Sequence, residues 1–255
     1  MPVSLPAMPL ILLATCLSLL LASCSSPDKA RGPATAEDVW QRGKTAFDDN
    51  DVVEAQAQFD IIKLQYPASQ YADDAQYYLA EINFKRGEFI LAAFNYSLVR
   101  RSYPSSEFAK TSAFKAAECY NQIAPPMDRD QEYTKKAIQA YSEFQSIYPQ
   151  DSLALVSLER IADLRGRLAE RYLSIAQQYD ALIAPKSSLI YYDAVIDEYP
   201  DTKQYEVALA GKLDILLRQK KYDEARTVIA LWHKSVRAPM KNERLDAYER
   251  QLNNR

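Results

Sequence analysis

The thiol of Cys119 and the imidazole of His233 are the first side chains of this 255-residue chain to consider as a nucleophile or a base. Cys119 lies among small residues in a predicted helix (AFKAAECY), where a lone cysteine usually packs as a small buried side chain. His233 is the only histidine, so no second one is available to complete a zinc site. The carboxylate pairs at 48–49 and 73–74 lie in predicted helices or at their ends, with no apolar pocket to shift a pKa. We therefore expect no enzyme activity, no metal site and no cofactor.

Lipid modification is the chemistry that the sequence does indicate, at Cys24. This cysteine follows Leu21-Ala22-Ser23 at the end of the uncharged apolar stretch 10–23. A stretch of fourteen residues is shorter than the about 20 needed to span a membrane but matches the core of a signal peptide. The small residues admit a peptidase and the thiol carries a diacylglyceryl group, so the pattern is similar to the lipobox of bacterial lipoproteins. We predict that residues 1–23 are a signal peptide and that Cys24 anchors the protein in a lipid bilayer.

Two other interpretations of this segment stay open. An ordinary signal peptide could end near a cysteine by chance, and residues 1–9 lack the Lys or Arg that usually starts such a peptide. Alternatively, the protein could be a cytosolic adaptor in which this segment is not cleaved. In that case a palmitate analogue would not label Cys24. The lipoprotein interpretation further predicts that residues 24–35, which are small, polar and Pro/Gly-bearing, form a tether that extends at most roughly 40 Å.

The composition argues against nucleic acid as a partner. The net charge is -3 and the isoelectric point is near 5.4, so no broad attraction to a polyanion is expected. None of the five glycines belongs to a Gly-rich run before a helix, so a phosphate-binding loop has no candidate. Once residues 1–23 are removed, Cys24 and Cys119 are the cysteines left, which leaves no disulfide framework.

A repeated pattern covers the rest of the chain. A small residue is followed by an apolar or aromatic residue four positions later, an apolar residue after seven, and proline after twelve. The copies are Ala55-Phe59-Ile62-Pro67, Ala92-Tyr96-Val99-Pro104, Ala137-Tyr141-Phe144-Pro149 and Ser188-Tyr192-Val195-Pro200, with Ala225-Ile229-Trp232 as a fifth copy that lacks the proline. Positions 0, 4 and 7 share one helical stripe, and Tyr-Pro ends the helix. The pattern resembles the second helix of a tetratricopeptide repeat.

The helices between these copies complete the predicted architecture. First helices are expected over 36–49, 71–86, 107–123 and 203–219, each before a second helix. A charged loop is expected over 124–133, and apolar spacing without proline predicts one long helix over 152–181 that joins two halves. We predict an all-α superhelical solenoid of about five helix pairs, with repeats 1–3 in residues 36–149 and repeats 4–5 plus a terminal helix in residues 150–255.

Three segments make the resemblance more specific than tetratricopeptide repeats in general. The DRDQ of 128–131, the LRGRLAERYLSIAQQY of 164–179 and the DEYPDT of 197–202 occur in the order and near the spacing of the BamD (ComL) family of lipoproteins, which this chain resembles over nearly all of its mature length. The resemblance implies a protein lipid-anchored on the periplasmic face of a Gram-negative outer membrane. It further implies a scaffold of the β-barrel assembly machinery, with the barrel-inserting BamA-type subunit, other assembly lipoproteins and unfolded outer-membrane proteins as partners.

Aromatic residues of the first helices are the candidate substrate groove. First helices line the concave side of such solenoids, where rings in register could hold the aromatic end of an extended substrate strand. In the repeat register, two stripes arise, Trp40, Tyr77 and Phe114 in one and Phe47 and Phe84 in the other. The alternative is that one or both stripes are packing positions between helices.

The long helix supplies the candidate partner contact. Arg165, Arg167 and Arg171 could pair with acidic groups of the barrel-inserting subunit, although a solvated helix face near Asp163 and Glu170 explains them as well. Tyr191 stands where the family usually has arginine, a departure that puts an ion pair at that position in doubt.

Two competing functions remain. A different periplasmic repeat lipoprotein, for envelope division or polysaccharide export, would share the fold but not the DRDQ segment. An anchored enzyme with accessory repeats would need a catalytic domain, yet only residues 238–255 lie beyond the repeats.

Overall fold

A computed structural model describes residues 34–235 and 243–253, and every regular element within these ranges is an α-helix. Residues 1–33, with the predicted signal peptide, Cys24 and most of the tether, lie outside the described residues. The helices are α2 (Ala36–Asp48), α3 (Val52–Gln65), α4 (Ala72–Lys85), α5 (Phe89–Ser102), α6 (Phe108–Gln122), α7 (Glu132–Ile147), α8 (Ser152–Ala181), α9 (Pro185–Glu198), α10 (Gln204–Arg218), α11 (Tyr222–Ser235) and α12 (Glu243–Asn253).

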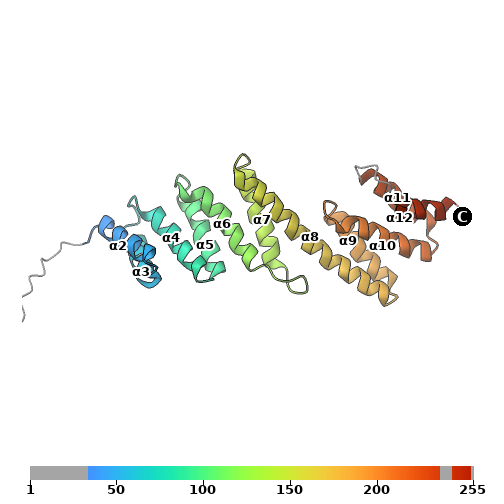
Figure 1. Ribbon diagram of the computed structural model, residues 1–255, viewed down its shortest axis with the longest axis horizontal. Coiled ribbons are helices and arrows are strands. Elements are labelled where there is room, and N and C mark those ends of the chain that lie inside the picture. The colour runs from blue at the N-terminus through green and yellow to red at the C-terminus, as the bar shows by residue number, and fades with distance from the viewer. Residues whose placement is uncertain (1–33, 236–242, 254–255) are drawn as a thin grey trace, which may run out of the picture.

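The helices stack in a row along one axis, and Figure 1 shows them as an elongated arrangement with α2 at one end and α12 at the other. Each helix from α2 to α12 contacts the next one in sequence. First helices also contact each other, α4 with α6 and α8 with α10, so they form the more closely packed row. The predicted all-α tetratricopeptide-type solenoid is therefore the observed fold.

The Tyr-Pro pairs end the second helices as predicted. Tyr66, Tyr103, Tyr148 and Tyr199 are the C-caps of α3, α5, α7 and α9, with φ between -131 and -123 and ψ between 47 and 62. Proline disfavours the α region for the residue before it, which accounts for these angles. The Ser or Thr after the proline receives hydrogen bonds from the start of the next helix. The carbonyl oxygens of Ser69, Ser106 and Thr202 accept from the N–H groups of Ala72, Ala109 and Tyr205, and the hydroxyl of Ser106 also accepts from the N–H of Phe108 at 3.1 Å.

The residues of the repeat pattern form the core. Ala55, Phe59, Ile62 and their equivalents in the next two repeats are at most 1% exposed. Two of these aromatic residues are tyrosines whose hydroxyl groups donate hydrogen bonds. Tyr96 donates to Glu81 at 2.6 Å, and Tyr141 donates to Glu118. Burial of the apolar rings stabilises each helix pair, and the hydroxyl hydrogen bonds avoid the cost of an unpaired buried donor.

The long helix α8 has the bounds that its apolar spacing predicts, residues 152 to 181. Leu164 packs with Ala117 and Tyr141 of the third repeat. Leu168 and Leu173, only one to three turns later, belong to the large cluster that extends to α12. The same helix thus contributes to the cores of both halves and fixes them to each other.

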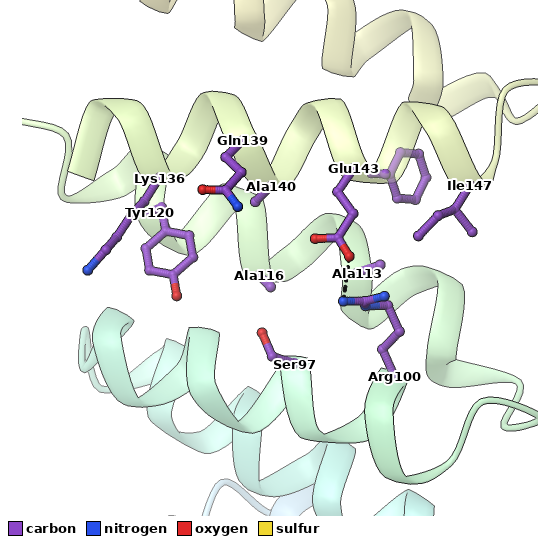
Figure 2. A pocket seen from close by; sticks show the side chains of 11 residues that line it. Ser97, Arg100, Ala113, Ala116, Tyr120, Lys136, Gln139, Ala140, Glu143 and Ile147 are labelled. Carbon is purple, nitrogen blue, oxygen red and sulfur yellow. Dashed lines mark ion pairs between the residues drawn. The ribbon is translucent and has the colours of Figure 1, made fainter. Parts of the chain in front are cut away.

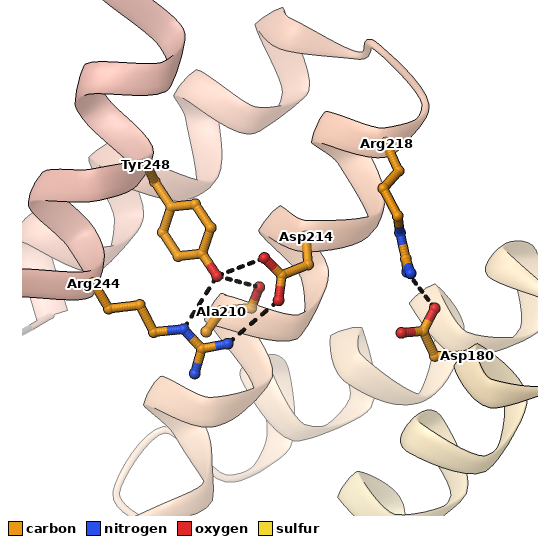
Figure 3. A network of polar contacts seen from close by, with 6 residues as sticks. All are labelled: Asp180, Ala210, Asp214, Arg218, Arg244 and Tyr248. Atoms are coloured by element: carbon orange, nitrogen blue, oxygen red, sulfur yellow. Dashed lines mark hydrogen bonds and ion pairs between the residues drawn. The ribbon is translucent and has the colours of Figure 1, made fainter.

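The terminal helix α12 closes the solenoid against α10. The hydroxyl of Tyr248 donates to Asp214 Oδ1 at 2.7 Å and lies 3.4 Å from the carbonyl oxygen of Ala210, and Arg244 donates to the same hydroxyl at 3.1 Å (Figure 3). One helix pair earlier, Arg218 forms an ion pair with Asp180 of α8. These contacts and the buried side chains of Leu245 and Leu252 cover the apolar end of the stack.

Candidate functional site

Each ring of the first predicted aromatic stripe packs on one side against the second helix of its own repeat. Trp40 contacts Phe59, Tyr77 contacts Tyr96 and Phe114 contacts Tyr141, with ring centroids 5.6, 5.9 and 5.8 Å apart. Every one of these partners is the aromatic of the second helix in the same repeat. The rings of the stripe are nevertheless only half-buried, so each keeps an accessible part.

Tyr78, which the sequence reasoning missed, connects the two stripes. Its ring lies 5.6 Å from Trp40, 4.9 Å from Phe47 and 5.5 Å from Tyr77. Beyond Tyr77, the ring of Phe108 in α6 stacks at 4.2 Å. The two adjacent tyrosines, Tyr77 and Tyr78, are the sequence signal that could have predicted this contact between the two stripes. Phe114 does not join the row, because it packs against Phe144 and Tyr141 of α7.

The second stripe carries lysines over its rings. The ammonium of Lys85 lies 3.9 Å from the centroid of Phe47, and that of Lys115 lies 6.0 Å from the centroid of Phe84. Lys44 lies 5.5 Å from the ring of Tyr78. Cations over ring faces are attracted by the ring quadrupole. The aromatic–lysine face, as we call it, consists of Trp40, Lys44, Phe47, Tyr77, Tyr78, Phe84, Lys85, Phe108 and Lys115 on α2, α4 and α6.

One carboxylate organises the centre of this face. Glu81 accepts hydrogen bonds from the ammonium of Lys115 and from the hydroxyl of Tyr96. Burial favours the neutral acid, but the hydrogen bonds from these two donors together outweigh it and lower the pKa of Glu81. Glu81 therefore stays ionised at neutral pH and holds Lys115 near the rings of Tyr77 and Phe84.

The predicted partner-contact arginines are engaged within the chain. Arg165 binds Asp201 through two hydrogen bonds of 2.8 and 2.6 Å and donates to the carbonyl oxygen of Glu198 at 2.8 Å. Arg171 donates to the carbonyl oxygens of Met127 and Arg129, and so holds the charged loop that precedes α7. Both side chains have an intramolecular role that the helix sequence did not reveal.

The other two predicted contact residues differ from each other. Tyr191 packs within the C-terminal half, with its ring stacked 5.6 Å from Tyr179. Arg167 makes only a 3.7 Å approach to Asp163, one turn earlier on the same helix. Of the three predicted contact arginines in α8, Arg167 is thus the one with the weakest internal contact.

A cleft of about 270 Å³ lies between α5 and α7 (Figure 2). Its floor consists of the small side chains of Ala113 and Ala116 on α6, and an ion pair of 2.7 Å between Arg100 and Glu143 crosses one end. No sequence motif indicated this cleft. The space is open because the side chains of Ala113 and Ala116 on α6 and of Ser97 on α5 are small.

The potential catalytic side chains occupy ordinary positions. Cys119 is fully buried, and burial raises the pKa of its thiol to about 12, so it is a packed thiol as expected. His233 is exposed and lies 2.5 Å from Glu249 of α12. Among the described residues no group of His, Cys, Asp and Glu side chains is arranged to hold a metal ion, and none of the described helices is long and apolar enough to cross a membrane.

Comparison with solved structures returns helical-repeat proteins. A tetratricopeptide repeat protein from Parabacteroides merdae ATCC 43184 is 15% identical, with 86% of each chain covered and a TM-score of 0.39. A thermophilic tetratricopeptide repeat protein from Thermus thermophilus is 15% identical, with 87% of this chain and 100% of that chain covered and a TM-score of 0.36. A search of curated proteins finds none that matches.

The family comparison is the informative one. The model of the YfiO family, described as outer membrane lipoprotein, matches residues 33–230. That range begins just before α2 and ends within α11, so it includes the aromatic–lysine face, the loop held by Arg171 and the whole of α8. This protein belongs to the YfiO family of outer membrane lipoproteins.

Proposed function

We propose that this protein is a lipid-anchored, non-catalytic scaffold of the machinery that folds and inserts β-barrel proteins into the outer membrane. Membership of an outer membrane lipoprotein family supports the location at the outer membrane. The assignment to the barrel-assembly machinery is supported by the resemblance to BamD-type lipoproteins, which is carried by the segments 128–131, 164–179 and 197–202. Anchoring would occur through Cys24. The partners would be the barrel-inserting subunit, other assembly lipoproteins and unfolded outer-membrane proteins.

The observation that carries this proposal is the aromatic–lysine face on the first helices α2, α4 and α6. Half-buried rings offer apolar contact to an aromatic side chain, while the ammonium groups of Lys44, Lys85 and Lys115 lie within 6.0 Å of ring centroids. A chain segment that ends in an aromatic residue and a free carboxylate matches both properties. We propose that the C-terminal strand of an unfolded barrel protein binds there.

A purification experiment tests whether the protein is part of the barrel-assembly machinery. C-terminally tagged protein would be isolated from detergent-solubilised envelopes, in wild-type form and as Cys24→Ala. We expect the barrel-inserting subunit to co-purify with the wild type and less of it with Cys24→Ala. Recovery of only cell-wall or export proteins would favour the alternative, a repeat lipoprotein of envelope division or polysaccharide export.

A binding experiment tests the face. A synthetic peptide with the C-terminal sequence of a barrel protein would be titrated into wild-type protein, Lys85→Glu and Phe84→Ala, with far-UV circular dichroism as the folding check. Lys135→Glu on α7 and Phe94→Ala on α5 are the matched controls, because both side chains are exposed away from the face. We expect the two face variants to weaken binding about tenfold or more, as the loss of one charge or aromatic contact does. Equal affinities in all five proteins would rule the face out as the binding site.

A further inference from the structure

The turn between α8 and α9 holds a branched side chain in a backbone conformation that suits glycine. Ile183 has a φ of 55, two residues beyond the end of α8. The equivalent residues of three other repeats, Asn50, Gly87 and Lys220, also have a positive φ, and each N–H donates to the carbonyl oxygen three residues earlier. A β-branched residue is the least suited to this conformation, because the groups on its Cβ crowd the backbone. The geometry of the turn therefore does not explain isoleucine at position 183.

Burial does not explain this residue either. The side chain of Ile183 is 88% exposed, and that of Leu182 beside it is 73% exposed. The corresponding helix ends of the other three turns have polar residues next to the positive φ, Asp49, Arg86 and Gln219. Aliphatic side chains gain free energy when they leave water. Leu182 and Ile183, which we call the α8–α9 tip, thus have the properties of residues that a surface outside the described chain covers.

The tip lies at one edge of the solenoid, the lower edge in Figure 1, beside the turn of the next repeat. Arg218, at the end of α10, forms an ion pair with Asp180, near the end of α8, so these two turns are neighbours. The charged loop before α7 is bound to Arg171, ten residues before the end of α8. Ten helical residues extend about 15 Å, which is about two Debye lengths at physiological salt. The acidic side chains of that loop therefore have little effect at the tip.

Two exposed lysines flank the tip. Lys186 lies in the first turn of α9, and Lys220 lies in the turn between α10 and α11. Neither forms an ion pair with a residue that the structure describes, whereas Lys221 is paired with Glu224 at 3.0 Å. An apolar centre with cations at its rim matches an anionic bilayer surface. Aliphatic side chains enter the acyl boundary there, and lysines contact the phosphate groups.

A bilayer is favoured over a protein as the surface that covers the tip. The family of this chain consists of outer membrane lipoproteins, so a bilayer is close to the folded part. A stable protein interface buries about 800 Å² on each partner, far more than two neighbouring side chains offer, whereas a membrane contact needs only a few aliphatic side chains and cations. The predicted tether over 24–35 extends at most roughly 40 Å, about twice the length of the thirteen-residue helix α2. Such a tether lets an edge of the solenoid reach the bilayer.

We propose that the α8–α9 tip inserts into the periplasmic phospholipid surface of the outer membrane, with Leu182 and Ile183 in the acyl boundary and Lys186 and Lys220 at the phosphate groups. This second contact fixes the orientation of the anchored solenoid relative to the bilayer. The inference goes beyond the proposed function and does not depend on a role in barrel assembly.

A fluorescent reporter tests the insertion. Full-length lipidated protein with Leu182→Cys would be labelled with an environment-sensitive dye and reconstituted into vesicles of phosphatidylethanolamine and phosphatidylglycerol. Cys119 is buried and its thiol has a pKa raised to about 12, so the dye reacts at the introduced cysteine. We expect a blue-shifted emission that nitroxide-bearing lipids quench. Leu64→Cys, at an 81% exposed position on the opposite edge, is the matched control and should report water.

Substitutions around the reporter test the residues of the tip. Ile183→Asn should weaken insertion about tenfold, because it removes an aliphatic side chain. The same change should raise the Tm in detergent by about 2–4 °C, since asparagine adopts a positive φ more readily, and so separates membrane contact from folding. Lys186→Gln and Lys220→Asn should each weaken insertion about fivefold, and only in vesicles that contain phosphatidylglycerol. Arg101→Gln, exposed at the opposite edge, is the charge control.

Three results would overturn the proposal. The first is equal quenching of the reporters at positions 182 and 64, and the second is unchanged insertion of Ile183→Asn. The third is a reporter at 182 that leaves water only when the barrel-inserting subunit is added, which would identify a protein as the surface that covers the tip. Each of these leaves the proposed function standing, because co-purification with the barrel-inserting subunit tests that function separately.

Discussion

The guanidinium of Arg171, in the second half of α8, donates a hydrogen bond of 2.6 Å to the carbonyl oxygen of Met127, which lies 44 residues earlier in the chain. It also donates to the carbonyl oxygen of Arg129 in the same loop. The loop before α7 therefore takes its shape from a side chain of the next repeat. A residue that appears free for a partner when only its own helix is considered instead orders the charged DRDQ segment.

Removing this contact should loosen the loop. Arg171→Ala takes away two charge-assisted hydrogen bonds, so we expect a loss of about 1–2 kcal/mol in the free energy of unfolding. Hydrogen exchange of residues 124–131 should accelerate more than that of α6 and α7. Arg226→Ala, which removes an exposed ion pair within α11, is the control and should change little. Unchanged exchange in the loop would contradict the structural role of Arg171.

Alanine at Gly211 should destabilise the protein although alanine favours helices. Its Cβ would lie 2.3 Å from Cζ and 2.5 Å from the hydroxyl oxygen of Tyr192, a ring that is 4% exposed. Such overpacking costs about 1–3 kcal/mol, more than the roughly 1 kcal/mol gained in helix propensity. Urea denaturation measures the difference, and Gly166→Ala is the comparison that should shift in the stabilising direction. A stabilising effect at both positions would show that the Tyr192 ring moves freely.

The stability of the first repeats should depend on the protonation of Asp74. The expectation from the sequence that nothing shifts a pKa at 73–74 is wrong for Asp74, because burial raises the pKa of this carboxyl from 3.8 to about 6, with the carboxylates of Asp73 and Glu107 adding to the shift. The folded state thus favours the protonated acid, and the cost of ionisation grows as pH rises from about 4 to 6 and stays constant above that. Asp74→Asn should raise the Tm by up to a few degrees at pH 7.5, with the gain vanishing near pH 4.

Thermal scans between pH 4 and pH 8 measure this dependence. Glu159→Gln, at an exposed position of α8, serves as the control for the removal of a carboxylate outside the first repeats. A Tm gain for Asp74→Asn that does not change with pH would contradict the assignment.

The hydroxyl of Tyr248 should matter for the docking of α12. It is buried and bonded to Asp214 at 2.7 Å (Figure 3), so Tyr248→Phe should cost about 1 kcal/mol and speed hydrogen exchange in residues 243–253. Tyr179→Phe is the matched control, because among the described residues the hydroxyl of Tyr179 has no hydrogen-bond partner. Equal effects of the two substitutions would mean that apolar packing alone holds the terminal helix.

The sequence by itself determined the helices, their order and the residues that form the core. The stripe of Ala55, Phe59 and Ile62 repeats with a helical period, Tyr-Pro ends each second helix, and the spacing in 152–181 predicts α8 with its observed bounds. These signals are local, because periodicity and the restriction before proline act within a few residues. The Cys24 lipidation signal is local in the same way, and the prediction stands on the sequence alone.

Only the tertiary structure decided which side chains meet. Tyr78 joins the two aromatic stripes, Arg165 binds Asp201 across 36 residues, and Phe114 turns toward α7 instead of the row that Trp40 and Tyr77 share. Most of these contacts join residues of different helices, so they follow from how the helices pack and not from one helix alone. A cleft between residues 162–170 of α8 and the turn from Asp201 to Gln204 arises in the same way, since its two walls belong to different parts of the chain. Sequence spacing specifies one helix face at a time, whereas a surface shared by three helices exists only once they are packed.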